Sequence, residues 1–244
     1  MTEVPDPDLP ALVHPAWPDE LPWLLQGTTT RGSGTPFDLG LFSDASTSSH
    51  VLGCWEALRM RTGLPSVVHA RQVHGAVVRF HRALPPGLHL AEPCDGHVTA
   101  EPGVLLVVTV ADCVPVSLVM PKRRAVALLH AGWRGAAAGV LGRGLQVLRE
   151  RLGPGEVWVH LGPSICGRCY EVGPEVFRSL GLAVPSSPRP LDLGGWLADR
   201  AAALGIPQER ITRSSHCTLC GDTDLFSHRG GNAARQAGFL GMLE

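Results

Sequence analysis

A cysteine and a histidine near the ends of two neighbouring strands are the strongest candidates for chemistry in this sequence. Cys113 follows a continuous apolar run, and His130 ends the apolar segment 125–130. That segment and the one at 116–120 flank a four-residue Pro-Lys-Arg-Arg connection, which is typical of a β-hairpin. If the last residue of the first strand pairs with the first residue of the second, His130 lies opposite Pro115, two residues from Cys113. We therefore expect the thiol and the imidazole to lie close together.

A thiol beside an imidazole has two chemical interpretations. The histidine can be the base that activates a cysteine nucleophile. Alternatively, the two side chains are ligands of a metal site that needs one more nitrogen ligand. The residues by themselves leave both interpretations open.

Two further pairs of cysteines have the spacing of metal ligands. Cys166 and Cys169 form one Cys-x-x-Cys pair, and Cys217 and Cys220 form the other. By spacing alone, two such pairs can build a structural site in which four thiolates hold one zinc ion. A second zinc ion per chain would identify such a site.

The composition is that of a folded and nearly neutral protein. The 244 residues, 44% of them hydrophobic and 18% charged, are enough to bury a sizeable core. A net charge of -1 creates no field that would attract nucleic acid or an anionic membrane, so we expect neither partner. The sequence shows neither a membrane-spanning apolar stretch nor a signal-peptide pattern, which predicts a cytoplasmic protein. Seven cysteines, an odd number, favour thiols, metal ligands or a nucleophile over a disulfide framework.

The distribution of prolines and polar residues predicts how the chain is organised. Six prolines at or before residue 22 argue against a helix there, so we expect an extended Pro-rich arm over residues 1–22. A single catalytic domain is expected over 23–244. Residues 28–49 are rich in Gly, Ser, Thr and Asp, which predicts a long functional loop.

Apolar periodicity predicts a mixture of helices and strands. Helices are expected at 140–152, 173–180 and 194–204, and strands at 76–80, 104–110, 116–120, 125–130, 157–161 and 211–215. The turn at 131–135 separates the last hairpin strand from the first helix. Strands that are mostly linked by hairpins favour an α+β fold over a doubly wound parallel sheet.

Several blocks of the sequence resemble, in order and spacing, the signature blocks of the YfiH-like family. The three main blocks are Arg71-Gln72-Val73-His74-Gly75, Thr109-Val110-Ala111-Asp112-Cys113 and His130-Ala131-Gly132-Trp133-Arg134-Gly135. The others, which extend the resemblance to the C-terminus, are Gly162-Pro163-Ser164-Ile165, Cys169-Tyr170-Glu171-Val172-Gly173, Cys217-Thr218, Phe226-Ser227 and Arg235-Gln236-Ala237-Gly238.

The resemblance implies a fold, an activity and a metal. The implied fold is a layered α/β/β/α domain with mixed, largely hairpin-connected sheets. Members were long described as multicopper polyphenol oxidases or laccases and are purine nucleoside phosphorylases, for adenosine, inosine, guanosine or methylthioadenosine, that also deaminate adenosine. The implied ligands of a Zn²⁺ ion are His74, Cys113 and His130. Two imidazoles and a thiolate suit zinc, or Cu²⁺, and leave one position open for catalysis, in which zinc would activate the water that attacks C6 of adenine.

The substrates implied are a nucleoside and phosphate, and four residues are candidates to bind them. Arg31 is the only cation of its loop, and guanidinium groups and loop amides bind phosphate oxygens well. Arg71 and Arg229 are further candidates for the phosphate. Gln72 lies two residues from His74, so in an extended segment it would share a face with the metal ligand and contact the base or the ribose.

The sequence departs from the family pattern near the expected substrate site. Residues 37–40 read Phe-Asp-Leu-Gly where a Ser-Leu-Asn-Leu-Gly pattern is usual. His228 and Gly230 stand where Tyr and a second Arg are common, and Ala234 stands where Gly is usual. These departures affect substrate binding and leave the three metal ligands unchanged. Cys169 and Cys217 lie in blocks that recur in the family without a four-cysteine site.

Three alternatives to a zinc enzyme use the same residues. A metal-free cysteine hydrolase would use Cys113 as nucleophile and His130 as base. A copper-binding polyphenol oxidase would use the three ligands, although a conventional laccase is excluded because none of the 11 histidines forms a His-x-His pair. A non-catalytic metal-binding module would close the site with a fourth protein ligand.

Overall fold

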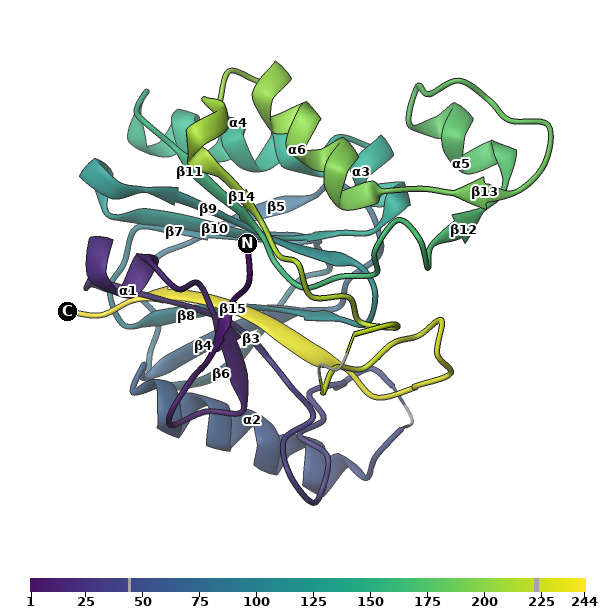
Figure 1. The fold of residues 1–244 in the computed structure, drawn as a ribbon. Helices are drawn as coiled ribbons and strands as arrows, with labels where there is room; N and C mark the ends of the chain where they lie inside the picture. Colours follow the sequence, from purple (N-terminus) through teal and green to yellow (C-terminus); the bar gives the residue numbers. More distant parts are fainter. Residues whose placement is uncertain (44, 222–223) are drawn as a thin grey trace.

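The computed structural model describes residues 1–43, 45–221 and 224–244, and its core is two mixed β-sheets stacked face to face. Helices lie on both outer faces, so the layers follow the order helix, sheet, sheet, helix (Figure 1). The predicted α/β/β/α arrangement of mixed sheets in an α+β protein is therefore confirmed.

The seven-stranded sheet includes strands from both ends of the chain. Its order is β1-β2-β3-β15-β8-β4-β6. The C-terminal strand β15 pairs antiparallel with both β3 and β8, whereas β4 runs parallel to β8 and β6. The strands are β1 Val4–Pro5, β2 Ala11–Val13, β3 Leu24–Thr29, β4 Ser66–Ala70, β6 Gly87–Ala91, β8 Val104–Val110 and β15 Gln236–Met242.

The six-stranded sheet is built around the predicted hairpin. Its order is β14-β11-β9-β10-β7-β5, with β9 antiparallel to both β10 and β11. The strands are β5 Val78–His81, β7 Gly96–Thr99, β9 Val114–Met120, β10 Ala125–Ala131, β11 Trp158–Leu161 and β14 Ile211–Arg213. A separate pair of short strands is formed by β12 Glu171–Val172 and β13 Arg189–Pro190.

The helices cover the two sheets from outside. In Figure 1, α2 lies beneath the seven-stranded sheet, and α4, α6 and α3 lie above the six-stranded one. The α-helices are α1 Trp17–Glu20, α2 Ser48–Thr62, α3 Trp133–Ala137, α4 Val140–Leu152, α5 Pro174–Ser179 and α6 Leu193–Ala203, and the 3-10 helices are η1 Pro121–Arg123 and η2 Gln208–Arg210. No helix in the described ranges is long and apolar enough to span a membrane.

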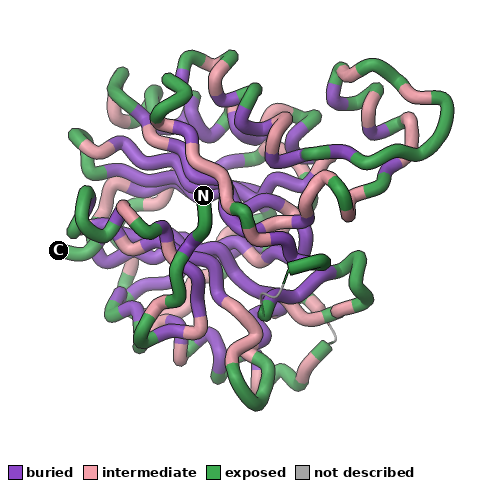
Figure 2. The backbone as a smooth tube through the Cα atoms, viewed as in Figure 1, coloured by how far each residue is buried: buried purple, intermediate pink, exposed green. Residues whose placement is uncertain are grey.

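Alternation along β10 divides the apolar core into layers. Ala127 and Leu129 pack in the layer between the six-stranded sheet and its helices, whereas Val126 and Leu128 pack between the two sheets. Side chains alternate with period two along a strand, so His130 follows Leu128 onto the face between the sheets. Figure 2 shows the resulting concentration of buried residues in the sheets. The imidazole therefore points toward the opposing sheet.

The hairpin has the register predicted from the sequence. Met120 pairs with Ala125, and His130 pairs with Pro115. The connection is the 3-10 helix η1 followed by Arg124 at a φ of 45°. The predicted strand at 104–110 and helix at 140–152 are likewise confirmed as β8 and α4.

The N-terminal segment differs from the extended arm predicted for residues 1–22. Its strands β1 and β2 join the seven-stranded sheet, and β2 pairs with β3. The expectation of no helix is wrong, because Trp17–Glu20 forms a helical turn with Pro18 in its first positions, where proline needs no amide. Burial of Trp17 to 4% exposure anchors this turn. The boundary at residue 22 stays a prediction.

Other segments also differ from the sequence expectations. The loop expected over 28–49 is shorter, because its first residues end β3 and its last residues begin α2. The strand expected at 76–80 begins only at Val78, and the turn after His130 continues as the short helix α3. Strands β3, β4, β6, β7 and β15 and helix α2 were not predicted.

Candidate active site

Three side chains converge at one end of the stacked sheets. The imidazoles of His74 and His130 and the thiol of Cys113 each offer one ligand atom, and these atoms lie within 4.8 Å of one another. His74 lies in the loop after β4, Cys113 lies between β8 and β9, and His130 lies in β10. The prediction that Cys113 and His130 lie close together is confirmed. Two imidazoles and one thiolate are a donor set that suits zinc or copper.

Backbone conformation brings His74 into this group. Its φ of 58° lies in the left-handed region, so the segment is not extended. Gly132 is the neighbour that makes room for the group: a Cβ atom there would lie 2.9 Å from the Cys113 Sγ and 3.1 Å from the His74 ring. A side chain at this position would therefore displace the two ligands, so the packing around the site requires glycine at position 132.

A buried aspartate, Asp95, orients two of the three ligands. His130 Nδ1 donates to Asp95 Oδ1 at 2.9 Å, and the carboxylate is fully buried. The same carboxylate accepts from the backbone amides of His74 at 2.8 Å and Gly75 at 2.7 Å. Because Nδ1 is engaged, His130 presents Nε2 to the site, an arrangement typical of histidines that bind metal. The sequence analysis missed Asp95.

The charges around Cys113 and His130 favour a thiolate and an imidazolium. Burial raises the pKa of Cys113, but the charge of His130 and hydrogen bonds with both histidines outweigh it and lower that pKa to about 6. Burial lowers the pKa of His130, but the charge of Cys113 and the hydrogen bond to Asp95 raise it to about 9. The thiolate is the form that binds a metal or attacks an electrophile.

Asp112 holds the loops that surround Cys113. Its φ of 87° turns the chain sharply before the cysteine. Its carboxylate accepts from the Thr218 hydroxyl at 2.6 Å and from the Arg229 amide at 2.7 Å, and its carbonyl accepts from the Ile165 amide at 3.0 Å. Three distant segments therefore meet around the Ala-Asp-Cys turn.

Two cavities open onto this group of ligands. The larger, with a volume of about 420 Å³, is lined by all three ligands and by Arg71 and Arg235. A volume of this size is within the range of roughly 300–1,000 Å³ that is common for small-molecule sites. A neighbouring cavity of about 260 Å³ is lined by His74, Cys113, Tyr170, His228 and Arg229, among others.

The predicted phosphate-binding arginines lie in different places. Arg71 lines the larger cavity and Arg229 the neighbouring one. Arg31 lines neither: its guanidinium donates to the Leu225 carbonyl at 3.0 Å and to Asn232 Oδ1 at 2.8 Å. Arg235, which the sequence analysis did not single out as a ligand contact, lines the larger cavity.

Gln72 lines the larger cavity, but its amide group is engaged elsewhere. Its Nε2 donates to the Thr109 carbonyl at 2.8 Å, and its Oε1 accepts from the Thr109 amide at 2.7 Å. The positive φ of His74 means that the segment is not extended at this residue, although Gln72 and His74 line the same cavity. Gln72 joins this loop to β8.

Comparisons with known proteins show which family and which fold this chain resembles. The family described as "Multi-copper polyphenol oxidoreductase laccase" matches residues 26–243. The solved structure of YlmD from Geobacillus stearothermophilus superposes over the whole of both chains with a TM-score of 0.89 at 28% identity. In sequence, the protein named purine nucleoside phosphorylase YlmD from that organism is 39% identical over 165 residues, which are 62% of this chain and 60% of that protein.

Two further relatives are similar over more of their length. A purine nucleoside phosphorylase from Xylella fastidiosa strain 9a5c is 35% identical over 235 residues, which cover 87% of this chain and 89% of the relative. A protein named adenosine deaminase RL5, from an unknown prokaryotic organism, is 34% identical over 194 residues, 71% of this chain and 73% of the relative.

Proposed function

The chain belongs to the multi-copper polyphenol oxidoreductase laccase family, and on that premise we propose that it is a zinc-dependent purine nucleoside phosphorylase that also deaminates adenosine. The names of its relatives support the proposal, since they include purine nucleoside phosphorylase and adenosine deaminase. The observation that carries it is the convergence of His74, Cys113 and His130 on one cavity.

The three ligands and Asp95 form the metal-binding part of the site. When bound, zinc supplies a Lewis acid with one coordination position open to water or substrate. Asp95 fixes the ring of His130 through Nδ1 and the backbone of His74 through its amide. The chain thus holds two ligands in place by one buried carboxylate, which limits their reorganisation during the reaction.

The cations of the two cavities are proposed to bind the phosphate. In phosphorolysis a phosphate oxygen forms a bond to C1′ of the ribose while the bond from C1′ to the base breaks. Arg71 is exposed on the larger cavity, beside the ligands, and we assign it the phosphate contact. We assign Arg229 a second contact with the phosphate, from the neighbouring cavity. We assign Arg31 and Gln72 positioning roles, since Arg31 holds the segment before His228 and Gln72 holds Thr109.

Replacement of His74 tests the proposal. We expect His74→Ala to lose both the bound metal and the activity on nucleosides, whereas His89→Ala retains both. His89 is a suitable control because it is half-buried, lines neither cavity, and places its Nε2 against the Pro85 carbonyl at 2.7 Å. Elemental analysis of the purified protein identifies the metal as zinc or copper. Retention of metal and activity in His74→Ala would refute the proposal.

A metal-free cysteine hydrolase is the second candidate. The observation that favours it is the pairing of a Cys113 whose pKa is lowered to about 6 with His130 as its neighbour. A chelator separates the two candidates: it inactivates the zinc enzyme and leaves the hydrolase active. Iodoacetamide applied after chelation would then inactivate the hydrolase by alkylating Cys113.

A further inference from the structure

We propose that Cys166, Cys169, Cys217 and Cys220 bind a structural zinc ion that joins two loops beside the candidate active site. The four sulfur atoms lie within 4.8 Å of one another, although the two pairs are about fifty residues apart in sequence. Four thiolate ligands leave no position open for a substrate, so this site would support the fold and take no part in the chemistry.

The spacing of the sulfurs matches a zinc tetrahedron better than disulfide bonds. The Sγ atoms of Cys166 and Cys220 are 3.7 Å apart. With zinc–sulfur bonds of about 2.3 Å, the edges of a tetrahedron are about 3.8 Å long. A disulfide would bring its two sulfurs to about 2.05 Å. One ion at the centre of the four atoms therefore fits without a large movement of the two loops.

Backbone amides around Cys217 form the environment of a metal thiolate. The amides of Cys166, Leu219 and Cys220 donate to the Cys217 sulfur at 3.3, 3.4 and 3.5 Å. A metal-bound thiolate accepts hydrogen bonds from backbone amides in this way. Two of these donors belong to the second Cys-x-x-Cys loop itself, so that loop is already wrapped around its first sulfur.

A nearby cation balances part of the charge of such a centre. Four thiolates and one divalent zinc ion carry a net charge of two negative units. Arg168 lies between the first two cysteines in sequence and interacts with the sulfurs of Cys166 and Cys220. Binding would release to solvent the protons that the four sulfurs still hold, so the affinity of the site rises with pH.

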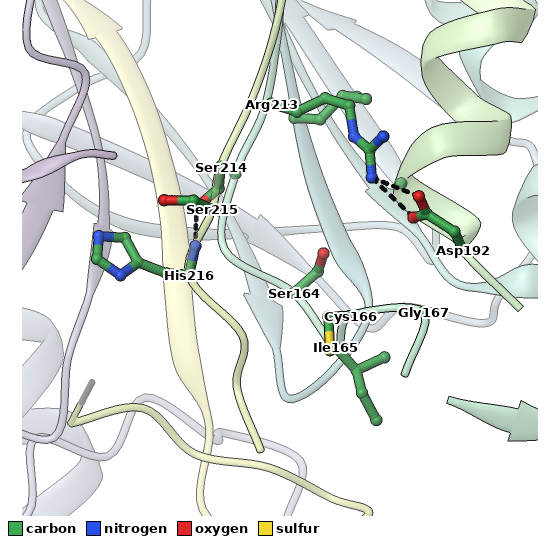
Figure 3. Close-up of a pocket in the computed structure, with 12 residues that line it drawn as sticks. Ser164, Ile165, Cys166, Gly167, Asp192, Arg213, Ser214, Ser215 and His216 are labelled. Atoms are coloured by element: carbon green, nitrogen blue, oxygen red, sulfur yellow. Dashed lines mark hydrogen bonds and ion pairs between the residues drawn. The ribbon is translucent and has the colours of Figure 1, made fainter. Parts of the chain in front are cut away.

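The rest of the fold already places the two loops against each other. Ser164 and Cys217 form a β-bridge, and the Thr218 amide donates to the Ser164 carbonyl at 3.2 Å. Figure 3 shows Cys166 and Gly167 at a cavity that also holds the ion pair of Asp192 and Arg213. A Cβ atom on Gly167 would lie 3.0 Å from Asp192, so the first loop packs directly on the residue that caps α6.

Both loops contact the turn that carries Cys113. Ile165, beside the first cysteine pair, donates to the Asp112 carbonyl, and Thr218, inside the second pair, donates to its carboxylate. Tyr170, next to Cys169, lines the cavity at the three-ligand site. A zinc ion between the loops would therefore fix one wall of the candidate active site.

Cobalt titration of the full chain tests this inference. The probe is Co²⁺ added to reduced, metal-free protein under nitrogen, because cobalt bound by thiolates gives strong visible and near-ultraviolet bands. We expect the wild-type chain to bind two equivalents and the His74→Ala/Cys113→Ala variant to bind one, with the bands of a four-thiolate site. Adding Cys169→Ser and Cys220→Ser to that variant removes these bands.

Two further variants guard against effects of misfolding. Cys54→Ser removes a buried cysteine outside both groups and should leave both equivalents bound. Cys220→His, added to the His74→Ala/Cys113→Ala variant, retains a zinc ligand of a common type and should keep its one equivalent with altered bands. The inference is overturned if the His74→Ala/Cys113→Ala variant folds but binds no cobalt, or if mass spectrometry of the protein as isolated shows disulfides within these four cysteines and no metal. None of these readouts depends on a nucleoside, so they are independent of the proposed activity.

Discussion

The two groups of metal-ligating side chains differ in ligand number, ligand type and surroundings. The group of His74, Cys113 and His130 offers three ligands of two types that line a cavity, with His74 exposed and His130 buried, and a buried aspartate orients it. The group of four cysteines offers four ligands of one type on two loops, and one of them, Cys220, is exposed.

This difference assigns the two groups different tasks. Three ligands leave a position open and need a rigid frame, which the strands β9 and β10 and the buried carboxylate of Asp95 supply. Four ligands saturate an ion, so their loops need no precise frame before the metal binds. The first group is therefore suited to chemistry, and the second to holding loops together.

The largest expected effect is the difference in activity between a variant that lacks a cysteine of the first group and one that lacks a cysteine of the second. Cys113→Ala should lower the activity at least about a hundredfold, because even partners outside the ligand shell contribute about 10–100-fold. Cys220→Ala should retain most of the activity at 20 °C but lower the midpoint of thermal unfolding. Product formation and thermal unfolding of both variants check this. Similar losses of activity in the two variants would remove the distinction between the groups.

Asp95→Asn sharpens the account of the three-ligand group. The amide side chain of asparagine has the size of the carboxylate but no negative charge. It therefore cannot accept hydrogen bonds from His130 and from the His74 and Gly75 amides with both of its terminal atoms. We expect metal affinity or activity to fall by about 10–100-fold. Competition with a chromogenic chelator measures the affinity. Unchanged metal affinity together with unchanged activity would show that the carboxylate does not orient the ligands.

Substitutions of two arginines distinguish a residue that binds phosphate in the cavity from one that holds a surrounding loop in place. Arg71→Ala should raise the KM for phosphate by about tenfold or more, because a charged hydrogen bond contributes roughly 1.5–3 kcal/mol. Arg31→Ala should act mainly on stability, because its guanidinium is engaged with Leu225 and Asn232. Initial rates at varied phosphate concentration measure the first effect. A larger change of KM in Arg31→Ala would reverse the two assignments.

The smallest expected effect on activity comes from a change that acts on stability, through the pH dependence of the core behind the three-ligand group. Burial lowers the pKa of His69 to about 4, and its Nδ1 contacts the Val107 carbonyl at 3.1 Å. Between pH 6.5 and pH 4 the unfolded chain takes up a proton at this residue that the folded chain does not. Its contribution to stability is therefore complete above pH 6.5 and is lost as the pH falls, on the order of 2 kcal/mol by pH 5.

His69→Gln checks this effect. Denaturant unfolding at pH 7 and pH 5 should show a smaller pH dependence in the variant than in the wild type. His89 is only half-buried, so His89→Gln is the matched control and should keep the wild-type dependence. An equal dependence in all three proteins would show that His69 does not contribute.

The parts of the site within one hairpin could be predicted from the sequence. The register that places His130 opposite Pro115 follows from the positions of two apolar strands and the short connection between them. The four cysteines could be grouped by their spacing, and the structure does bring their sulfurs together.

The parts that depend on long-range pairing could not be predicted. Asp95 reaches His130 because β7 pairs with β10, which places Gly96 beside Leu129, and no local pattern reveals that pairing. Nothing in the sequence indicates the positive φ of His74, so the backbone conformation that carries this ligand could not be predicted. Helix α2 follows a polar loop and has only a weak amphipathic pattern, so periodicity does not reveal it.

The most direct test of the central claim is product analysis with adenosine. The zinc-loaded protein is incubated with adenosine, with and without phosphate, and the products are separated by liquid chromatography beside the Cys113→Ala variant. The account predicts adenine and ribose 1-phosphate only when phosphate is present, inosine in either case, and none of the three products with the variant. Absence of all three products from the wild-type protein, or their undiminished formation by Cys113→Ala, would contradict it.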